Sequence, residues 1–362
     1  MLKSALLALS LLLSAPAFAQ TPAGYPADYQ KLFDAAKQEG KVTVYSTTDA
    51  AQVAPLVDAF KAKYPGVGVE YTDLNSTELY NRFIAEEAAG QGTADLLWSS
   101  AMDLQVKLVS DGYAATYKSP EQAGLPAWAV WKDQAYGTTA EPLAIVYNKR
   151  LVPEGDVPKS HADLLKLLQT KTDTYKGKVT LYDPERSGVG FLQLTQDVRV
   201  WPQAWDLFQA FGKVDAKLYT SVGAMLERIG SGEHLIGYNL FASYALARSK
   251  KDPGIAWVLP SDYTLLTSRV AFVSGKARSP NAARLFLDFV LSREGQSVIA
   301  NQADLYSIRA DVTGEATLSR VKERVGEDKL KAVPIDASLL DNLNQMKRLT
   351  FIRKWQAAMK GG

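Results

Sequence analysis

Five turns in the sequence carry hydroxyl, amide and glycine residues in an arrangement suited to binding an anion. Each turn follows an apolar segment typical of a β-strand and precedes a segment with helical spacing, so its residues fall near a helix N-terminus. Hydroxyl groups and backbone N–H groups at that position receive anions, and Arg186 adds paired donors for phosphate or carboxylate. The candidate ligand-binding residues are Tyr45, Ser46, Thr47, Asn75, Ser76, Trp98, Ser99, Ser100, Arg186, Ser187, Gly188, Val189, Tyr238 and Asn239.

Each of these residues also has a purely structural interpretation. Serine, threonine and asparagine at helix starts often act as caps, and Tyr45, Trp98 and Tyr238 could belong to the core. Arg186 has Asp183 nearby in the sequence as an ion-pair partner. The sequence leaves both interpretations open, although several such turns meeting in one cleft would favour ligand contact.

Signatures of catalysis are weak by comparison. The sequence has no cysteine and only two histidines, which excludes thiolate or multi-histidine metal sites and a cysteine nucleophile. It has no nucleophile elbow, zinc-protease helix, phosphate-binding P-loop or dinucleotide-binding glycine turn. We predict no catalytic residue, no metal site and no cofactor; the enzymatic alternative is an exported hydrolase or lyase that uses Asp183, Glu185 and Arg186.

The N-terminus has the features of a secretory signal peptide. Lys3 supplies a positive charge, residues 6–13 form an apolar stretch, and Ala17-Phe18-Ala19 is a small-residue cleavage box. The apolar stretch is shorter than the ~20 residues of a membrane-spanning helix, which disfavours a retained anchor. We predict cleavage after Ala19 and a periplasmic mature protein.

The composition indicates which partners can be excluded and how many domains to expect. The formal net charge is +2 and falls further when Lys3 is removed, so nucleic acid is not expected as a partner. The absence of cysteine excludes disulfide bonds and a lipoprotein anchor. A mature chain of about 340 residues exceeds the usual size of one core and indicates two domains.

Strand and helix patterns alternate along the chain, which predicts an α/β fold with mainly parallel sheets covered by helices. Asn75 with Glu78, and Ser160 with Asp163, have the spacing of helix caps. We expect residues 128–137 to be irregular, and we expect His161 on the solvated surface and His234 in a structural role. The expected strands are 42–45, 67–71, 94–98, 143–147, 179–182, 235–238 and 255–258, a long extended segment spans 263–273, and a helix begins near residue 192.

Several segments of the chain, taken in order, resemble the type 2 periplasmic solute-binding proteins of ABC importers. The resemblance is to the branch with ferric-ion-, phosphonate- and sugar-phosphate-binding members. It rests on the segments Val42–Ser46, Ala94–Trp98, Ile145–Lys149, Ser292–Gln296 and Tyr306–Val312. It implies two lobes joined by two crossover strands, with lobe 1 formed by 20–140 and 270–362 and lobe 2 by 141–269, and a ligand held between them.

The resemblance also bears on the ligand. Ferric-binding members carry two adjacent tyrosines where this chain has Tyr238-Asn239, and a carboxylate ligand near the position of Ser99-Ser100. Ferric iron prefers anionic oxygen ligands, so these neutral replacements suit an organic anion better. In the family, the loop that matches Ser187–Val189 cradles an anion at a helix start.

The sequence thus favours a monomeric periplasmic receptor that delivers a small organic anion to an inner-membrane ABC permease. Candidate ligands are phosphonates, phosphorylated compounds and carboxylates. The alternative within the same class is ferric iron, held through Tyr45, Tyr238 or Tyr244 with a bridging anion.

Overall fold

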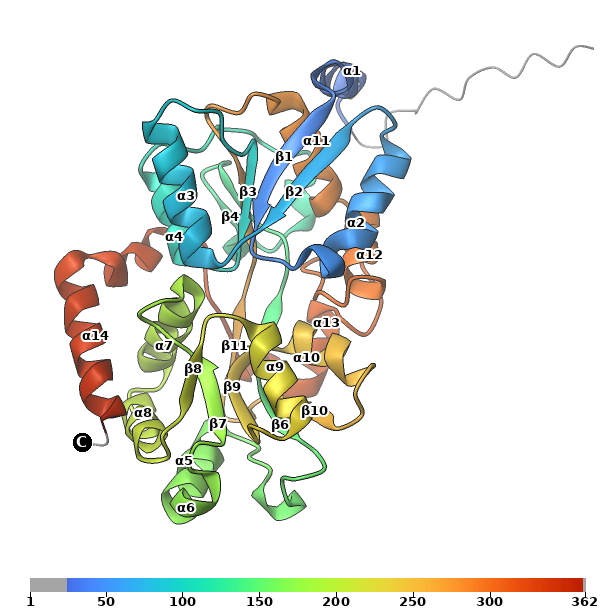
Figure 1. Cartoon of the computed structure of the whole chain (residues 1–362). Helices are drawn as coiled ribbons and strands as arrows, with labels where there is room; N and C mark the ends of the chain where they lie inside the picture. Colours follow the sequence, from blue (N-terminus) through green and yellow to red (C-terminus); the bar gives the residue numbers. More distant parts are fainter. Residues whose placement is uncertain (1–24, 361–362) are drawn as a thin grey trace, which may run out of the picture.

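The computed structural model describes residues 25–360, which form two α/β lobes, one above the other in Figure 1. The predicted signal peptide and its cleavage site lie outside these residues. Among residues 25–360, no helix combines the length and the apolar character needed to cross a membrane.

Lobe 1 is built on a six-stranded sheet with the strand order β2-β1-β3-β12-β5-β4. The pairs β1–β2 and β1–β3 are parallel, and β12 joins both β3 and β5 in antiparallel fashion. Its strands are β1 (Lys41–Ser46), β2 (Gly68–Asp73), β3 (Leu96–Ser99), β4 (Val130–Trp131), β5 (Ala135–Gly137) and β12 (Val270–Val273). Its helices are α1 (Tyr29–Glu39), α2 (Ala50–Lys63), α3 (Ser76–Ala88), α4 (Met102–Ser110), α11 (Pro280–Leu291) and α12 (Arg293–Asn301).

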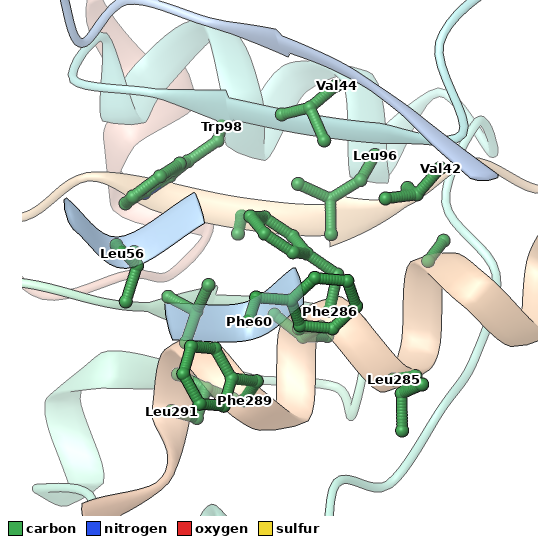
Figure 2. Packing of buried hydrophobic residues seen from close by; sticks show 14 of the residues in the cluster. Val42, Val44, Leu56, Phe60, Leu96, Trp98, Leu285, Phe286, Phe289 and Leu291 are labelled. Carbon is green, nitrogen blue, oxygen red and sulfur yellow. The ribbon is translucent and has the colours of Figure 1, made fainter. Parts of the chain in front are cut away.

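Side-chain alternation along the strands divides the apolar residues of lobe 1 between two cores. Val42, Val44, Leu96 and Trp98 face α2 and α11, as Figure 2 shows. The aromatic rings of Phe60 and Phe286 meet there edge to face, with centroids 5.0 Å apart. On the other face, Tyr45, Leu97 and Phe272 pack with α3 and α4. The central strands β3 and β12 are therefore buried on both faces, as expected for a sheet covered by helices on both sides.

Lobe 2 contains the second sheet, in the order β13-β11-β6-β9-β7-β8, with β10 also paired to β6. Its strands are β6 (Glu141–Asn148), β7 (Val179–Tyr182), β8 (Lys217–Tyr219), β9 (Ile236–Phe241), β10 (Ile255–Val258), β11 (Thr264–Thr267) and β13 (Leu330–Ala332). Its helices are α5 (His161–Thr170), α6 (Thr172–Tyr175), α7 (Gly188–Val200), α8 (Ala204–Lys213), α9 (Val222–Ser231), α10 (Ala242–Ser249), α13 (Leu318–Val325) and α14 (Gln345–Met359).

Two crossover segments, β5–β6 and β11–β12, run side by side between the lobes. Thr138 donates its backbone N–H to the carbonyl of Arg269 at 2.9 Å, and the N–H of Arg269 is donated to the Thr139 hydroxyl at 2.9 Å. A third passage lies beside them, because the N–H of Ala140 is donated to the carbonyl of Tyr306 at 2.8 Å. These bonds fasten the connections to one another at the boundary of the lobes.

The predicted α/β class, the two lobes and the two crossovers are confirmed, with several corrections. The sheets are mixed rather than mainly parallel, because each crossover strand enters its new sheet in the antiparallel direction. Residues 128–137 contain β4 and β5, and the extended segment 263–273 divides at the crossover into β11 and β12. α7 begins at Gly188, since the Ser187 hydroxyl already accepts the N–H of Gly190. The predicted caps Asn75 and Ser160 are confirmed.

The C-terminal helix α14 packs on lobe 2, whereas the predicted boundaries placed it in lobe 1. Trp355 is buried against Phe208 of α8, with ring centroids 5.3 Å apart, inside a core cluster of lobe 2. The reason is the aromatic face of α8, which a helix from elsewhere in the chain must cover. α13 and β13 also lie in lobe 2, because Leu318 and Val321 join its core and β13 pairs with β11.

The two histidines are both buried in lobe 2, which corrects the prediction of a surface position for His161. The His161 ring contacts the Asp262 carboxylate through Nδ1 at 2.8 Å and stacks on Tyr263 at 3.9 Å between centroids. His234 contacts the Tyr219 hydroxyl through Nε2 at 2.8 Å.

A buried carboxyl group makes the stability of lobe 1 depend on pH. Asp288 is inaccessible to solvent and accepts hydrogen bonds from the hydroxyls of Tyr29 at 2.9 Å and of Tyr117 and Ser119 at 2.6 Å. Burial raises the pKa of Asp288 to about 7, against the opposing effect of these bonds. The folded state therefore holds this proton more tightly than the unfolded state, whose pKa is near 3.8.

We predict that Asp288→Asn flattens the pH dependence of the melting temperature. The stability that Asp288 contributes is fully present below about pH 4 and is lost as the pH rises toward 7. The wild type should thus lose more stability between pH 5 and pH 8 than the variant, measured by circular dichroism. Asp58→Asn, at an exposed position of α2, should follow the wild type. Identical slopes for wild type and Asp288→Asn would contradict this assignment.

Candidate ligand-binding site

A cleft of about 270 Å³ lies between the lobes, and residues of both lobes line it. Lobe 1 contributes the ends of its parallel strands and the helix starts that follow them, including Thr47, Asn75, Ser76 and Ser100. Lobe 2 contributes Tyr182, Val189, Ser221, Phe241 and Tyr244. Arg269 reaches the cleft from the crossover segment.

Several helix N-termini point toward this cleft. Asn75 caps α3 by accepting the N–H of Glu78 at 2.9 Å, and Ser221 caps α9 by accepting the N–H of Ala224 at 3.4 Å. Asp49 directly precedes α2. The positive end of a helix dipole favours a negatively charged group. The helix N-termini therefore add to the attraction that the one arginine in the cleft lining exerts on an anion.

Arg269 is the buried cation of the cleft, with only 1% of its surface exposed. Its Nε lies 3.3 Å from a carboxylate oxygen of Glu141, and its Nη1 donates to the carbonyl of Thr47 at 3.4 Å. The rings of Phe241 and Tyr244 lie 5.3 and 5.6 Å from the guanidinium carbon. The remaining nitrogen, Nη2, is buried and has no hydrogen-bond partner among residues 25–360.

The surroundings of Arg269 keep its positive charge in place. Burial lowers its pKa, but neighbouring Tyr244 and Glu141 outweigh this effect and raise the pKa above its ordinary value. A buried charged donor without a partner is costly, and a ligand oxygen at Nη2 would remove that cost.

Tyr244 joins the two lobes across the cleft. Its hydroxyl lies 3.1 Å from a carboxylate oxygen of Asp49 and also accepts the backbone N–H of Asp49 at 3.2 Å. Burial raises the pKa of Tyr244 to about 12, with Arg269 opposing and Asp49 reinforcing the shift. The phenol is therefore neutral at neutral pH and acts as a hydrogen-bonding group.

Of the candidate residues predicted from sequence, five line the cleft: Thr47, Asn75, Ser76, Ser100 and Val189. Their shared position, at strand ends and helix starts, is the one the sequence pattern indicated. The hydroxyls of Thr47 and Ser100 lie 3.1 Å apart and tie two of these turns together.

The other nine predicted residues do not line this cleft, and all of them except the exposed Arg186 have partners elsewhere. Trp98 is fully buried and donates its ring N–H to the Thr138 hydroxyl at 2.7 Å. Tyr238 and Asn239 both donate to the buried Asp197 carboxylate, at 2.9 and 2.6 Å. Tyr45 instead lies beside the Glu86 carboxylate on α3, at 3.1 Å.

Ser46 and Ser99 stabilise their own turns by accepting the backbone N–H groups of Thr48 and Ala101.

The glycine loop at the start of α7 is occupied by lobe 1 itself. The N–H of Gly188 is donated to the Thr77 hydroxyl at 3.1 Å, and the N–H of Val189 to the Ser76 hydroxyl at 3.2 Å. Thr77 also donates to the carbonyl of Arg186 at 3.1 Å, while the Arg186 side chain is exposed. The donors expected to cradle an anion thus bind hydroxyls of α3 and hold the lobes together; we call these bonds the α3–α7 clasp.

The residues of the enzymatic alternative also lie outside the cleft. Asp183 accepts the N–H of Glu185 at 2.9 Å, and Glu185 accepts from the side chain of Gln356 at 2.8 Å. Both carboxylates are therefore engaged in local structure.

Sequence reasoning missed several lining residues, above all Arg269, Asp49, Asp73 and Glu78, and it named Tyr244 only for the ferric alternative. One signal was available: Arg269 is the only charged residue in the apolar stretch from Tyr263 to Val273. Among residues 25–360, no three His, Asp or Glu side chains are grouped in a way that could hold a metal ion.

Comparison with known proteins gives a consistent picture of the chain. The model of the family described as bacterial extracellular solute-binding protein matches residues 55–323. A substrate-binding protein of an ABC transporter from Agrobacterium tumefaciens is 36% identical, over 88% of this chain and 94% of that one, with a TM-score of 0.84. A Haemophilus influenzae protein named only as uncharacterized is 26% identical, over 90% of this chain and 92% of its own length.

More distant solved structures share the fold. AfuA from Actinobacillus pleuropneumoniae, with fructose-6-phosphate bound, is 21% identical over 89% of this chain and 99% of its own, with a TM-score of 0.71. Iron-bound HitA from Pseudomonas aeruginosa is 22% identical over 88% of this chain and 99% of its own, with a TM-score of 0.70.

We predict that Thr77→Val weakens closure of the lobes. The variant keeps the shape of the side chain but loses two hydrogen bonds of the clasp, a change of about 1–2 kcal/mol. Small-angle scattering of the ligand-free protein should give a larger radius of gyration than for the wild type.

Two further variants test this interpretation of the clasp. Gly188→Val should act in the same direction, because even a Cβ atom there would lie 2.6 Å from Leu104 of lobe 1. Thr170→Val removes a hydroxyl bonded only within α5 and should leave the radius unchanged. Equal radii for all four proteins would show that the clasp does not hold the lobes together.

Proposed function

This chain belongs to the bacterial extracellular solute-binding protein family, and on that basis we propose that it captures a small organic anion for an inner-membrane ABC permease. The ligand would carry a phosphonate, phosphate or carboxylate group. The mature protein would begin at Gln20. Like other members of this family, it would work in the periplasm.

The observation that carries this proposal is the presence of Arg269 in the lining of the cleft, with its guanidinium nitrogen Nη2 left without a hydrogen-bond partner among residues 25–360. A guanidinium presents its donors in a plane that matches the oxygens of phosphate and carboxylate groups. The N-terminus of α9 would add backbone and hydroxyl donors around the same group. Because none of these groups needs to transfer a proton, the arrangement supports binding rather than catalysis.

Both lobes contribute to the cleft, so binding would be coupled to closure. A ligand that contacts Ser76 on one lobe and Ser221 on the other stabilises the arrangement in which they face each other. The clasp and the Tyr244–Asp49 contact would support the same closed arrangement.

Ferric iron fits this cleft less well than an organic anion. Of the three tyrosines considered from sequence, only Tyr244 lines the cleft, whereas Tyr238 is bound to Asp197 and Tyr45 to Glu86. A hard trivalent ion needs several anionic oxygens at once. Asp49, Asp73 and Glu78 line the cleft, but among residues 25–360 no three such side chains are grouped in a way that could hold a metal ion. Although the relative HitA is described as iron-bound, the donor set of this chain is different.

We expect organic anions, and not ferric salts alone, to raise the melting temperature of ligand-stripped protein. At a ligand concentration one hundred times Kd, binding to the native state alone adds about 2.7 kcal/mol of stability. A screen that measures the melting temperature with phosphonates, sugar phosphates and carboxylates therefore tests the proposal directly. Stabilisation by ferric salts alone, with a visible tyrosinate-to-iron absorption, would contradict it.

We also predict that Arg269→Lys lowers the affinity for the ligand found in that screen at least tenfold. Lysine keeps the charge opposite Glu141, so the fold should survive, but it lacks the planar pair of donors. Calorimetric titration gives the affinity, and circular dichroism gives the stability. Arg186→Lys, at an exposed position outside the cleft, is the matched control and should bind as the wild type does.

A further inference from the structure

The charges around the cleft are distributed unequally between its two sides. Lobe 1 contributes three carboxylates: Asp49 before α2, Asp73 at the end of β2, and Glu78 in the first turn of α3. The lining residues from lobe 2 include no carboxylate, and the crossover contributes the cation Arg269. The cleft therefore has an acidic wall, formed by Asp49, Asp73 and Glu78, and a donor wall, formed by Ser221, Val222 and Arg269.

The acidic wall also offsets the helix dipoles on its own side. Asp73 accepts the backbone N–H of Ala50 at 2.9 Å, at the start of α2. Glu78 lies in the first turn of α3 and accepts from the side chain of Asn75 at 3.1 Å. A carboxylate at a helix N-terminus offsets the partial positive charge there, which is about half an elementary charge. Little attraction for an anion is left on this side.

A purely anionic ligand would therefore be attracted to one wall and repelled by the other. Three carboxylates against one guanidinium leave the lining with an excess of negative charge. A cleft of about 270 Å³ holds one small ligand, and residues of both walls line that same volume. A cationic group at the far end of the same ligand would turn the repulsion into a charge-assisted contact.

We propose that the ligand is a zwitterion: an anionic group bound at Arg269 and the N-terminus of α9, joined by a short chain to a protonated amine that faces Asp49, Asp73 and Glu78. This inference rests on the proposed function, since it accepts the anionic group and adds a cationic one. The unpartnered Nη2 of Arg269 fixes which end of the ligand binds where.

The test compares anions that differ only in the amine. Propylphosphonate is set against 3-aminopropylphosphonate, and butyrate against 4-aminobutyrate, each titrated by calorimetry into ligand-stripped wild type. The amine-bearing member of at least one pair should bind ten times more tightly or better. Tighter binding of the plain anion in both pairs would overturn the zwitterion while leaving the anion receptor intact. Stabilisation by no organic anion would overturn both.

Isosteric variants locate the amine. Asp73→Asn and Glu78→Gln keep the hydrogen bonds that these side chains accept, so both variants should fold. Each variant should lower the affinity for the amine-bearing ligand at least fivefold. The affinity for the plain anion should stay the same or increase. Asp58→Asn, at an exposed site outside the cleft, is the control. Equal losses for both members of a pair would assign these carboxylates to the structure of the cleft and overturn the proposed contact.

Discussion

The buried pair of Arg269 and Glu141 is the interaction around which the two lobes are arranged. Both side chains are almost inaccessible to solvent, and their closest polar atoms lie 3.3 Å apart. A buried charge is tolerated only when it is paired and hydrogen-bonded. Here Glu141 begins β6 in lobe 2, Arg269 lies just before β12 in lobe 1, and Nη1 reaches the carbonyl of Thr47. The pair therefore fixes the relative positions of the crossovers and of one strand end in lobe 1.

The same pair connects the hinge to the cleft. Arg269 lines the cleft where the lobes meet, and because Glu141 and Thr47 occupy only part of its guanidinium, one nitrogen is left without a partner among residues 25–360. Whatever binds there contacts the segment about which the lobes move. The clasp between α3 and α7 acts at a different point of the lobe interface, and its hydrogen bonds involve no ligand. The lobe interface thus contains two separate sets of contacts, one between α3 and α7 and one around Arg269 at the cleft.

The sequence predicted the turns of the site better than it predicted the side chains in them. Strand ends and helix starts follow from local patterns, so Thr47, Asn75, Ser76, Ser100 and Val189 were found. Which face of a strand meets the core depends on what covers it. The sequence could not show that Trp98 faces α2 and α11, or that Tyr238 bonds to Asp197.

Arg269 was missed for a related reason: its local pattern is that of an ordinary buried strand, and its role appears only when a second crossover lies beside it. In the same way, the glycine loop at α7 has the pattern of an anion cradle, and only the packing of α3 shows that hydroxyls fill it.

The C-terminal segment connects the two lobes on one flank of the molecule. A 3₁₀ helix at Ala337–Leu343 packs on lobe 1 through Leu339, and α14 packs on lobe 2 through Trp355, with Asn344 alone between them. Because only Asn344 separates the two elements, this connection cannot lengthen if the lobes move apart. It therefore limits the separation of the lobes on that flank. Any separation of the two lobes would therefore be larger at the opposite flank than beside Asn344.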